Sequence, residues 1–82
     1  MKLPIIRQLH QTQTPENLEA ALEVLESFTE FRGVSEEDVD VAGELITNIC
    51  GALEVHNQVK AGMTEKDALN TFAQKVLGSI DR

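Results

Sequence analysis

The most reactive side chain in this sequence is its single cysteine, Cys50. A cysteine becomes nucleophilic or redox-active when a nearby cation or a helix N-terminus stabilises its thiolate. The positions one helical turn away from Cys50 hold no lysine, arginine or histidine that could do this. We therefore expect Cys50 to pack as a small hydrophobic side chain, with a redox role as the alternative.

Two histidines, His10 and His56, are the other side chains that could bind a ligand, since either could join Cys50 or Glu54 around a metal ion. Metal ligands on one helix stand three or four residues apart. Around His56 those positions hold apolar side chains or a lysine. The sequence therefore predicts no metal site, no cofactor and no catalytic residue.

Charge is distributed unevenly along the chain, whose net charge is −7. Residues 1–15 contain two bases and no acid, residues 16–54 eleven acids and one base, and residues 55–82 four bases and three acids. An acidic middle repels phosphate groups, so we expect neither nucleic acid nor an anionic membrane as a partner. No apolar run approaches the roughly 20 residues that span a bilayer. One cysteine and no basic-then-apolar leader predict a location in the reducing cytoplasm.

A stripe of glutamates is the most unusual surface feature that the sequence predicts. The glutamates recur at three- and four-residue steps, and like charges at that spacing on a helix cost a few tenths of a kcal/mol per pair. The stripe is either a solvated face or a docking surface for a basic protein partner. Its members are Glu16, Glu19, Glu23, Glu26 and Glu30.

Small side chains line one strip of the longest predicted helix. A glycine inside a helix costs about 1 kcal/mol relative to alanine, so the two interior glycines there need a reason. Either the strip packs against another helix of the same chain, or it lets a second copy approach closely. Because the core of a chain of 82 residues is marginal, we expect a homodimer through this helix. The expected interface consists of Gly43, Thr47, Cys50, Gly51 and Glu54.

Apolar residues recur with helical spacing in four segments, which are 4–12, 15–32, 36–61 and 65–80. The first segment is the shortest, and its opening residues could instead be extended. The links between segments are short, so consecutive helices should be antiparallel neighbours. We expect an all-α fold with one domain over residues 1–82, built as a compact up-down bundle of three long helices plus a short N-terminal helix.

Residues that start and stop helices stand at the ends of these segments. Thr14, Ser35 and Thr64 occupy positions where an N-cap side chain accepts a hydrogen bond from the first turn. Gly33 and Gly62 occupy positions where a helix commonly ends in a left-handed residue.

Five stretches of the sequence match the pattern of a known family, and they are Met1–Ile6, Gly43–Ile46, Gly51–His56, Ala68–Phe72 and Val76–Asp81. Through them the chain resembles, nearly end to end, a family of short bacterial all-helical proteins of unknown function. The resemblance implies no established activity. It also hints at redox housekeeping, since such proteins look to be encoded near thioredoxin and peroxiredoxin genes.

Two functions remain open at this point. The residues favour a non-enzymatic protein-interaction or scaffold domain that self-associates as a homodimer. The alternative is a small redox accessory protein that uses Cys50 together with thioredoxin- or peroxiredoxin-type partners.

Overall fold

The computed structural model describes residues 2–80, with side chains as far as residue 76, and this part of the chain forms four helices and no strand. They are α1 (Leu3–Thr12), α2 (Pro15–Glu30), α3 (Glu36–Lys60) and α4 (Glu65–Ile80). The expectation of an all-α chain with three long helices and a short N-terminal helix is confirmed. Residues 3–12 are helical, so the extended alternative for this segment is wrong.

The predicted capping residues explain where three of the helices begin. The hydroxyls of Thr14, Ser35 and Thr64 each accept a hydrogen bond from the backbone N–H three residues later, at 3.1–3.2 Å. At the other end of α3, Gly62 has a φ of 111°, a left-handed conformation that favours glycine. These helix ends are set by local sequence, which is why the pattern predicted them.

The end of α2 differs from the prediction. The helix stops at Glu30, two residues early, because Phe31 is extended, with φ −74° and ψ 129°. Gly33 is not left-handed, since Gly62 is the only described glycine with a positive φ. A Cβ at Gly33 would lie 2.5 Å from the ring of Phe31, so glycine makes room for this aromatic side chain.

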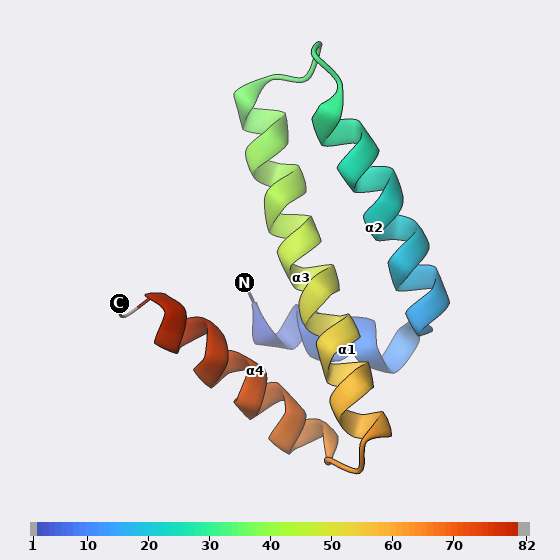
Figure 1. Ribbon diagram of the computed structural model, residues 1–82, viewed down its shortest axis with the longest axis vertical. Coiled ribbons are helices and arrows are strands. Elements are labelled where there is room, and N and C mark those ends of the chain that lie inside the picture. The colour runs from blue at the N-terminus through green and yellow to red at the C-terminus, as the bar shows by residue number, and fades with distance from the viewer. Residues whose placement is uncertain (1, 81–82) are drawn as a thin grey trace.

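Helix α3 is the centre of the fold, and each of the other helices packs against it (Figure 1). α2 and α3 form an antiparallel hairpin, whereas α1 and α4 pack against the C-terminal half of α3. Within the described residues α2 contacts neither α1 nor α4. The expected compact bundle is therefore open at one end. The reason is length, because the 10 residues of α1 cannot cover the 25 residues of α3.

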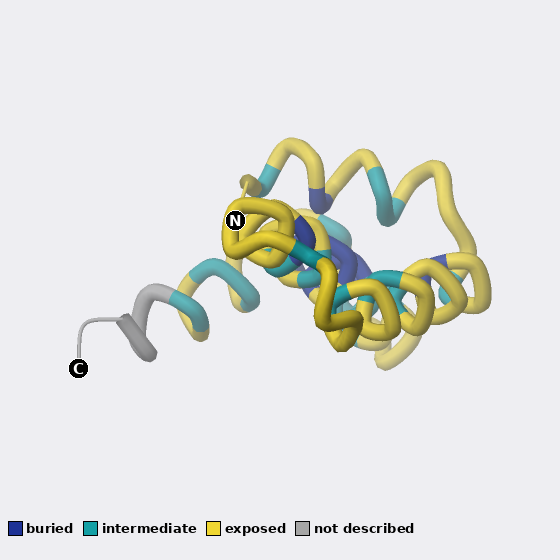
Figure 2. Tube along the Cα trace, turned by 90° about the horizontal axis from the view of Figure 1, so that it is seen from above, coloured by how far each residue is buried: buried dark blue, intermediate teal, exposed yellow. Residues whose placement is uncertain are grey.

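The hydrophobic core gathers at the end of α3 where α1 and α4 pack, and its buried members include Ile6, Ala52 and Val55. Figure 2, which looks along the hairpin, shows the buried residues near the centre of the view. No residue from 19 to 41, which covers most of α2 and the start of α3, is buried. The outer half of the hairpin, which we call the tip and define as residues 24–41, therefore adds little to the core.

Candidate functional site

One broad side of the α2–α3 hairpin is lined by apolar side chains that no other described part of the chain covers. Val24 and Phe28 on α2 are 69% and 43% exposed, and Val41 and Leu45 on α3 are 60% and 47% exposed. Each pair is four residues apart and forms one stripe, and antiparallel packing places both stripes on the same side. We call this surface the apolar side, and it consists of Ala21, Val24, Phe28, Val41 and Leu45.

Helix α1 occupies the same side of α3, one step further along. The stripe of Val41 and Leu45 continues into Asn48 and Ala52, which are buried. The backbone N–H of Lys2, just before α1, donates to Oδ1 of Asn48 at 3.1 Å. Figure 2 shows α1 lying on one side of the layer that α2 and α3 form. α1 is therefore a raised step at one end of the apolar side.

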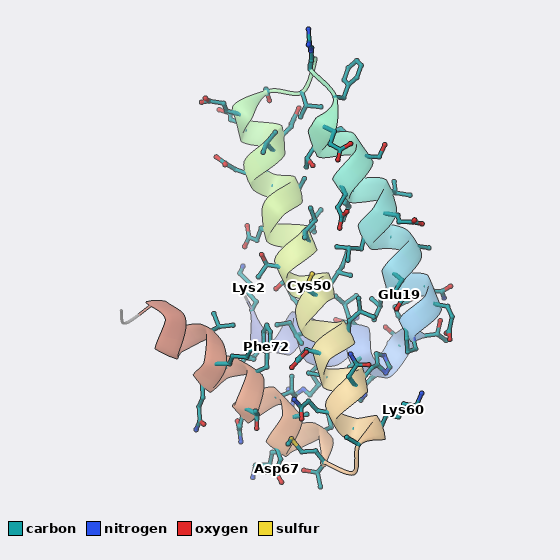
Figure 3. The ribbon with its side chains drawn as sticks, viewed as in Figure 1. Lys2, Glu19, Cys50, Lys60, Asp67 and Phe72 are labelled. Atoms are coloured by element: carbon teal, nitrogen blue, oxygen red, sulfur yellow. The ribbon has the colours of Figure 1, made fainter. Side chains whose placement is uncertain are left out.

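The opposite side of the hairpin carries the glutamate stripe. Its glutamates are exposed, and the charge of Glu26 reaches Cys50 on α3. Figure 3, in which Glu19 and Cys50 are labelled, views this side. Glu16 is exposed at the start of α2, at the edge between the two sides. We call this surface the acidic side, and it consists of Glu19, Glu23, Glu26, Glu30, Gly43, Thr47 and Cys50.

The strip of small residues expected to form a dimer interface is divided between different surroundings. Gly51 is buried, and a Cβ there would lie 2.8 Å from Cδ1 of Ile6 and 3.0 Å from the ring of Phe72. Of the two reasons considered for this glycine, packing within the chain is the one observed. Gly51 is thus not available to a second copy.

The remaining members of the strip face in other directions. Glu54 is half-buried, and its carboxylate accepts a hydrogen bond from Gln58 at 3.3 Å and lies 3.7 Å from Nζ of Lys75 on α4. Gly43 and Thr47 lie on the acidic side, where a Cβ at Gly43 would meet nothing within 4 Å. The hydroxyl of Thr47 donates to the carbonyl of Gly43 at 2.9 Å. The strip therefore does not form one continuous contact surface.

Cys50 is exposed, so the expectation that it packs as a small hydrophobic side chain is wrong. The neighbouring Ile49 takes the buried position on α3 instead. Partial burial and the charge of Glu26 raise the pKa of the Cys50 thiol above its ordinary value. A raised pKa means less thiolate at neutral pH, which is the opposite of what a reactive cysteine needs.

Two histidines and a glutamate from three helices come together where the core is closed. Nδ1 of His10 lies 2.7 Å from Oε2 of Glu65, and Nε2 of His56 lies 2.9 Å from the carbonyl oxygen of Gln13. The two imidazole centroids are 4.4 Å apart. The oxygen partners only accept, so each of these nitrogens carries the proton. The hydrogen bond from His10, aided by one from Gln11, holds the pKa of Glu65 below its ordinary value.

These contacts fasten the short helix α1 to α3 and α4. Across the residues that the structure describes, no group of three histidine, cysteine or acidic side chains is arranged to hold a metal ion. A shallow groove of about 330 Å³ lies between α1 and α4, at the lower end of the volumes of ligand sites. Glu65 in its wall is already engaged by His10, and we assign the groove no ligand.

The comparison with protein families matches residues 1–81 to the DUF6952 family, which is described as a family of unknown function. The chain belongs to the DUF6952 family. The resemblance to a family of unknown function is thereby confirmed. No curated protein and no solved structure matches the chain.

Sequence reasoning missed the residues that join the helices of this DUF6952 chain. Asn48 gave a usable signal, since it is a polar residue within an apolar stripe of α3, and a buried polar group needs a partner. The meeting of His10 and Glu65 gave none, because the two residues are 55 positions apart. No helix among residues 2–80 of the DUF6952 chain is both long enough and apolar enough to cross a membrane.

Proposed function

We propose that this DUF6952 chain is a non-enzymatic protein-interaction domain whose binding surface is the apolar side of the α2–α3 hairpin. The observation that supports the proposal is the exposure of Val24, Phe28, Val41 and Leu45 together on one face. The largest apolar patch on a monomeric protein is often a functional surface. The cytoplasmic location expected from the lone cysteine belongs to the same proposal.

The redox alternative has no support. It depends on Cys50, whose pKa is raised by burial and by Glu26. The family match names no activity that would call for a reactive thiol.

A basic protein partner remains a second proposal, and it would use a different surface. Negative charge is concentrated on the acidic side, where it would steer a basic protein during association. The apolar side supplies burial, which contributes more to affinity than exposed charge does. We therefore regard the apolar side as the main binding surface and the acidic side as an accessory one.

Photo-crosslinking in the native cytoplasm tests the main proposal. A photoreactive phenylalanine derivative replaces Phe28 on the apolar side or, as a matched control, the exposed Thr47 on the acidic side. We expect a discrete adduct of higher mass from position 28 and a weaker one or none from position 47. An adduct from position 47 alone, or no adduct from position 28 and from a second probe at Val41, would contradict the proposal.

A further inference from the structure

The tip of the hairpin is built from two helices that bury no side chain fully between them. Residues 24–41 include no buried side chain, and Ala42 is the first buried residue of α3. Leu22 and Leu25 on α2 are only half-buried where they pack against the core. Two helices in water need more apolar burial than this to stay paired, because helical stability in proteins comes mainly from packing. The tip therefore requires a cover on its apolar side.

The uncovered area is large enough for a partner. The exposed parts of the four large apolar side chains sum to several hundred Å², the size of the largest apolar patch on a typical monomer, which is often functional. Ile5 on the step formed by α1 adds to it, being 40% exposed. A standard interface buries about 800 Å² per partner, so the polar residues around the apolar side and the step would supply the rest of such a contact.

We propose that a second copy of this chain covers the apolar side, with the two hairpins face to face and antiparallel about a two-fold axis. This inference rests on the proposed function, which does not specify the partner, and it identifies that partner as a second copy of the chain. The apolar side of every folded copy has to be covered. A second copy of the chain is a partner that is present wherever the chain itself is. Two-fold pairing is also the commonest closed symmetry of soluble proteins.

The step formed by α1 decides the direction of the pairing. If the hairpins ran parallel, the α1 helices of the two copies would collide and hold the tips apart. In the antiparallel arrangement, the tip of each copy fits beside the α1 helix of the other. The part of α3 that α1 does not cover runs from residue 36 to about residue 46, and Val41 is at its middle. In the antiparallel pair, Val41 therefore lies near the two-fold axis and faces Val41 of the other copy.

Charge favours the same arrangement. The first turn of α3, at the tip, carries Glu36, Glu37 and Asp38. Residues 2–14, which include α1, contain no acid; Lys2 stands just before α1, whereas Arg7 lines the groove between α1 and α4. Figure 3 shows Lys2 beside α3 at the end of α1. Antiparallel pairing brings the acidic tip of one copy next to Lys2 of the other, and complementary charges favour such a register.

The acidic side does not oppose this dimer. Its glutamates lie on the side of the hairpin away from α1, so in a face-to-face pair they point outward into solvent on both copies. Gly43, Thr47 and Cys50 point outward with them. The homodimer expected from the sequence is thus retained, but its interface moves from the small-residue strip to the opposite side of α3.

Sedimentation equilibrium of the full chain tests the pairing, with interference optics because the chain has no Trp or Tyr. We expect twice the chain mass of 9.1 kDa at tens of micromolar. Val41→Glu should raise the dissociation constant at least about a hundredfold, because a buried charge without a partner is strongly unfavourable. Thr47→Glu, on the acidic side of the same helix, should leave it unchanged. A wild-type chain that is still monomeric at hundreds of micromolar overturns the inference.

A second experiment keeps the test valid if Val41→Glu fails to fold. In a Cys50→Ser background, Val41→Cys should give a disulfide-linked dimer on mild oxidation, since the two residues are near the axis. Thr47→Cys in the same background should not. A cross-link from position 47 and none from position 41 overturns the geometry.

The two proposals fail separately. A monomeric wild-type chain whose photo-crosslink at position 28 gives an adduct with a different protein overturns the second copy and leaves the interaction domain standing. A basic amphipathic helix is then the occupant to examine, as an acidic chain with an open apolar side would recruit it. A monomer without any adduct overturns both proposals.

Discussion

The Cβ that Gly51 lacks would lie 2.8 Å from Cδ1 of Ile6, so the close approach of α1 to α3 depends on glycine at this position. The ring of Phe72 on α4 lies almost as near, at 3.0 Å. One missing side chain thus allows two helices to pack against α3 at the same level. This contact explains an interior glycine that helix propensity alone disfavours.

Gly51→Ala should destabilise the chain although alanine is the better helix former. Overpacking a core of this kind costs about 1–3 kcal/mol, which exceeds the gain of about 1 kcal/mol in helix propensity. The matched control is Gly43→Ala, because a Cβ there meets nothing within 4 Å. We expect Gly43→Ala to stabilise the chain by up to about 1 kcal/mol. Urea unfolding followed by circular dichroism measures both, and an equal gain for the two variants would contradict the packing argument.

Asn48→Ala should loosen the N-terminal end of α1. The change removes the acceptor for the backbone N–H of Lys2. Asn48 itself is only 4% exposed. Losing a partly buried hydrogen bond of this kind costs about 0.5–1.5 kcal/mol. In hydrogen-exchange measurements, Asn48→Ala should speed amide exchange in the first turns of α1, relative to the wild type, more than it does in α4. Asn57→Ala changes an exposed asparagine on α3, the helix that carries Asn48, and serves as the control. It should change exchange in neither α1 nor α4.

The contact between His10 and Glu65 predicts a pH dependence of stability. Because the folded pKa of Glu65 is below its ordinary value, the folded state favours the carboxylate. Its contribution is complete above the ordinary glutamate pKa and is lost as pH falls through the lowered value. Glu65→Gln should therefore be less stable than the wild type near neutral pH, and the difference should shrink in acid.

Denaturant midpoints at neutral and acidic pH measure this difference for Glu65→Gln. Glu44→Gln, which changes an exposed carboxylate on α3, serves as the control for the loss of one negative charge. A difference between wild type and Glu65→Gln that stays constant from neutral pH into acid would show that the contact with His10 does not lower the pKa.

Cys50 should react slowly with alkylating reagents at neutral pH despite its exposure. The charge of Glu26 contributes to the raised thiol pKa, so Glu26→Gln should move the pH profile of alkylation toward lower pH. Glu19→Gln removes the same charge from the same helix but two turns away, and should leave the profile almost unchanged. Equal shifts for both variants would mean that overall charge, not Glu26, sets the reactivity. Fast alkylation of the wild type at neutral pH would revive the redox alternative.

Local sequence predicted the features of this fold that depend on local bonds. Thr14 caps α2 through an N–H three residues away, and such a bond needs no information from elsewhere in the chain. The end of α2 was mispredicted because it depends on how the ring of Phe31 packs over Gly33. Periodicity shows that both residues are near a helix end, but not which of them ends it.

The candidate site could be predicted only in part, for the same reason. The spacing of Val41 and Leu45 is enough to place them on one apolar seam of α3, and the structure contains that seam. Whether a seam is covered depends on the length and direction of the other helices. α1 covers the part of the seam from Asn48 to the C-terminal end of α3, and it leaves the part before Asn48 uncovered. The sequence does not show where this boundary lies. The seam before Asn48 therefore became a surface and not core.

The absence of contact between α2 and α4 in the described chain leaves α3 as the one helix that both ends of the molecule share. Parts of a protein that share few contacts open independently, each with its own free energy. The tip can therefore unravel while α1, α4 and the C-terminal half of α3 stay folded. Cleavage by a protease in the link at residues 31–35 then reports how much of the chain has its apolar side covered, so its rate should fall as the concentration of the protein rises.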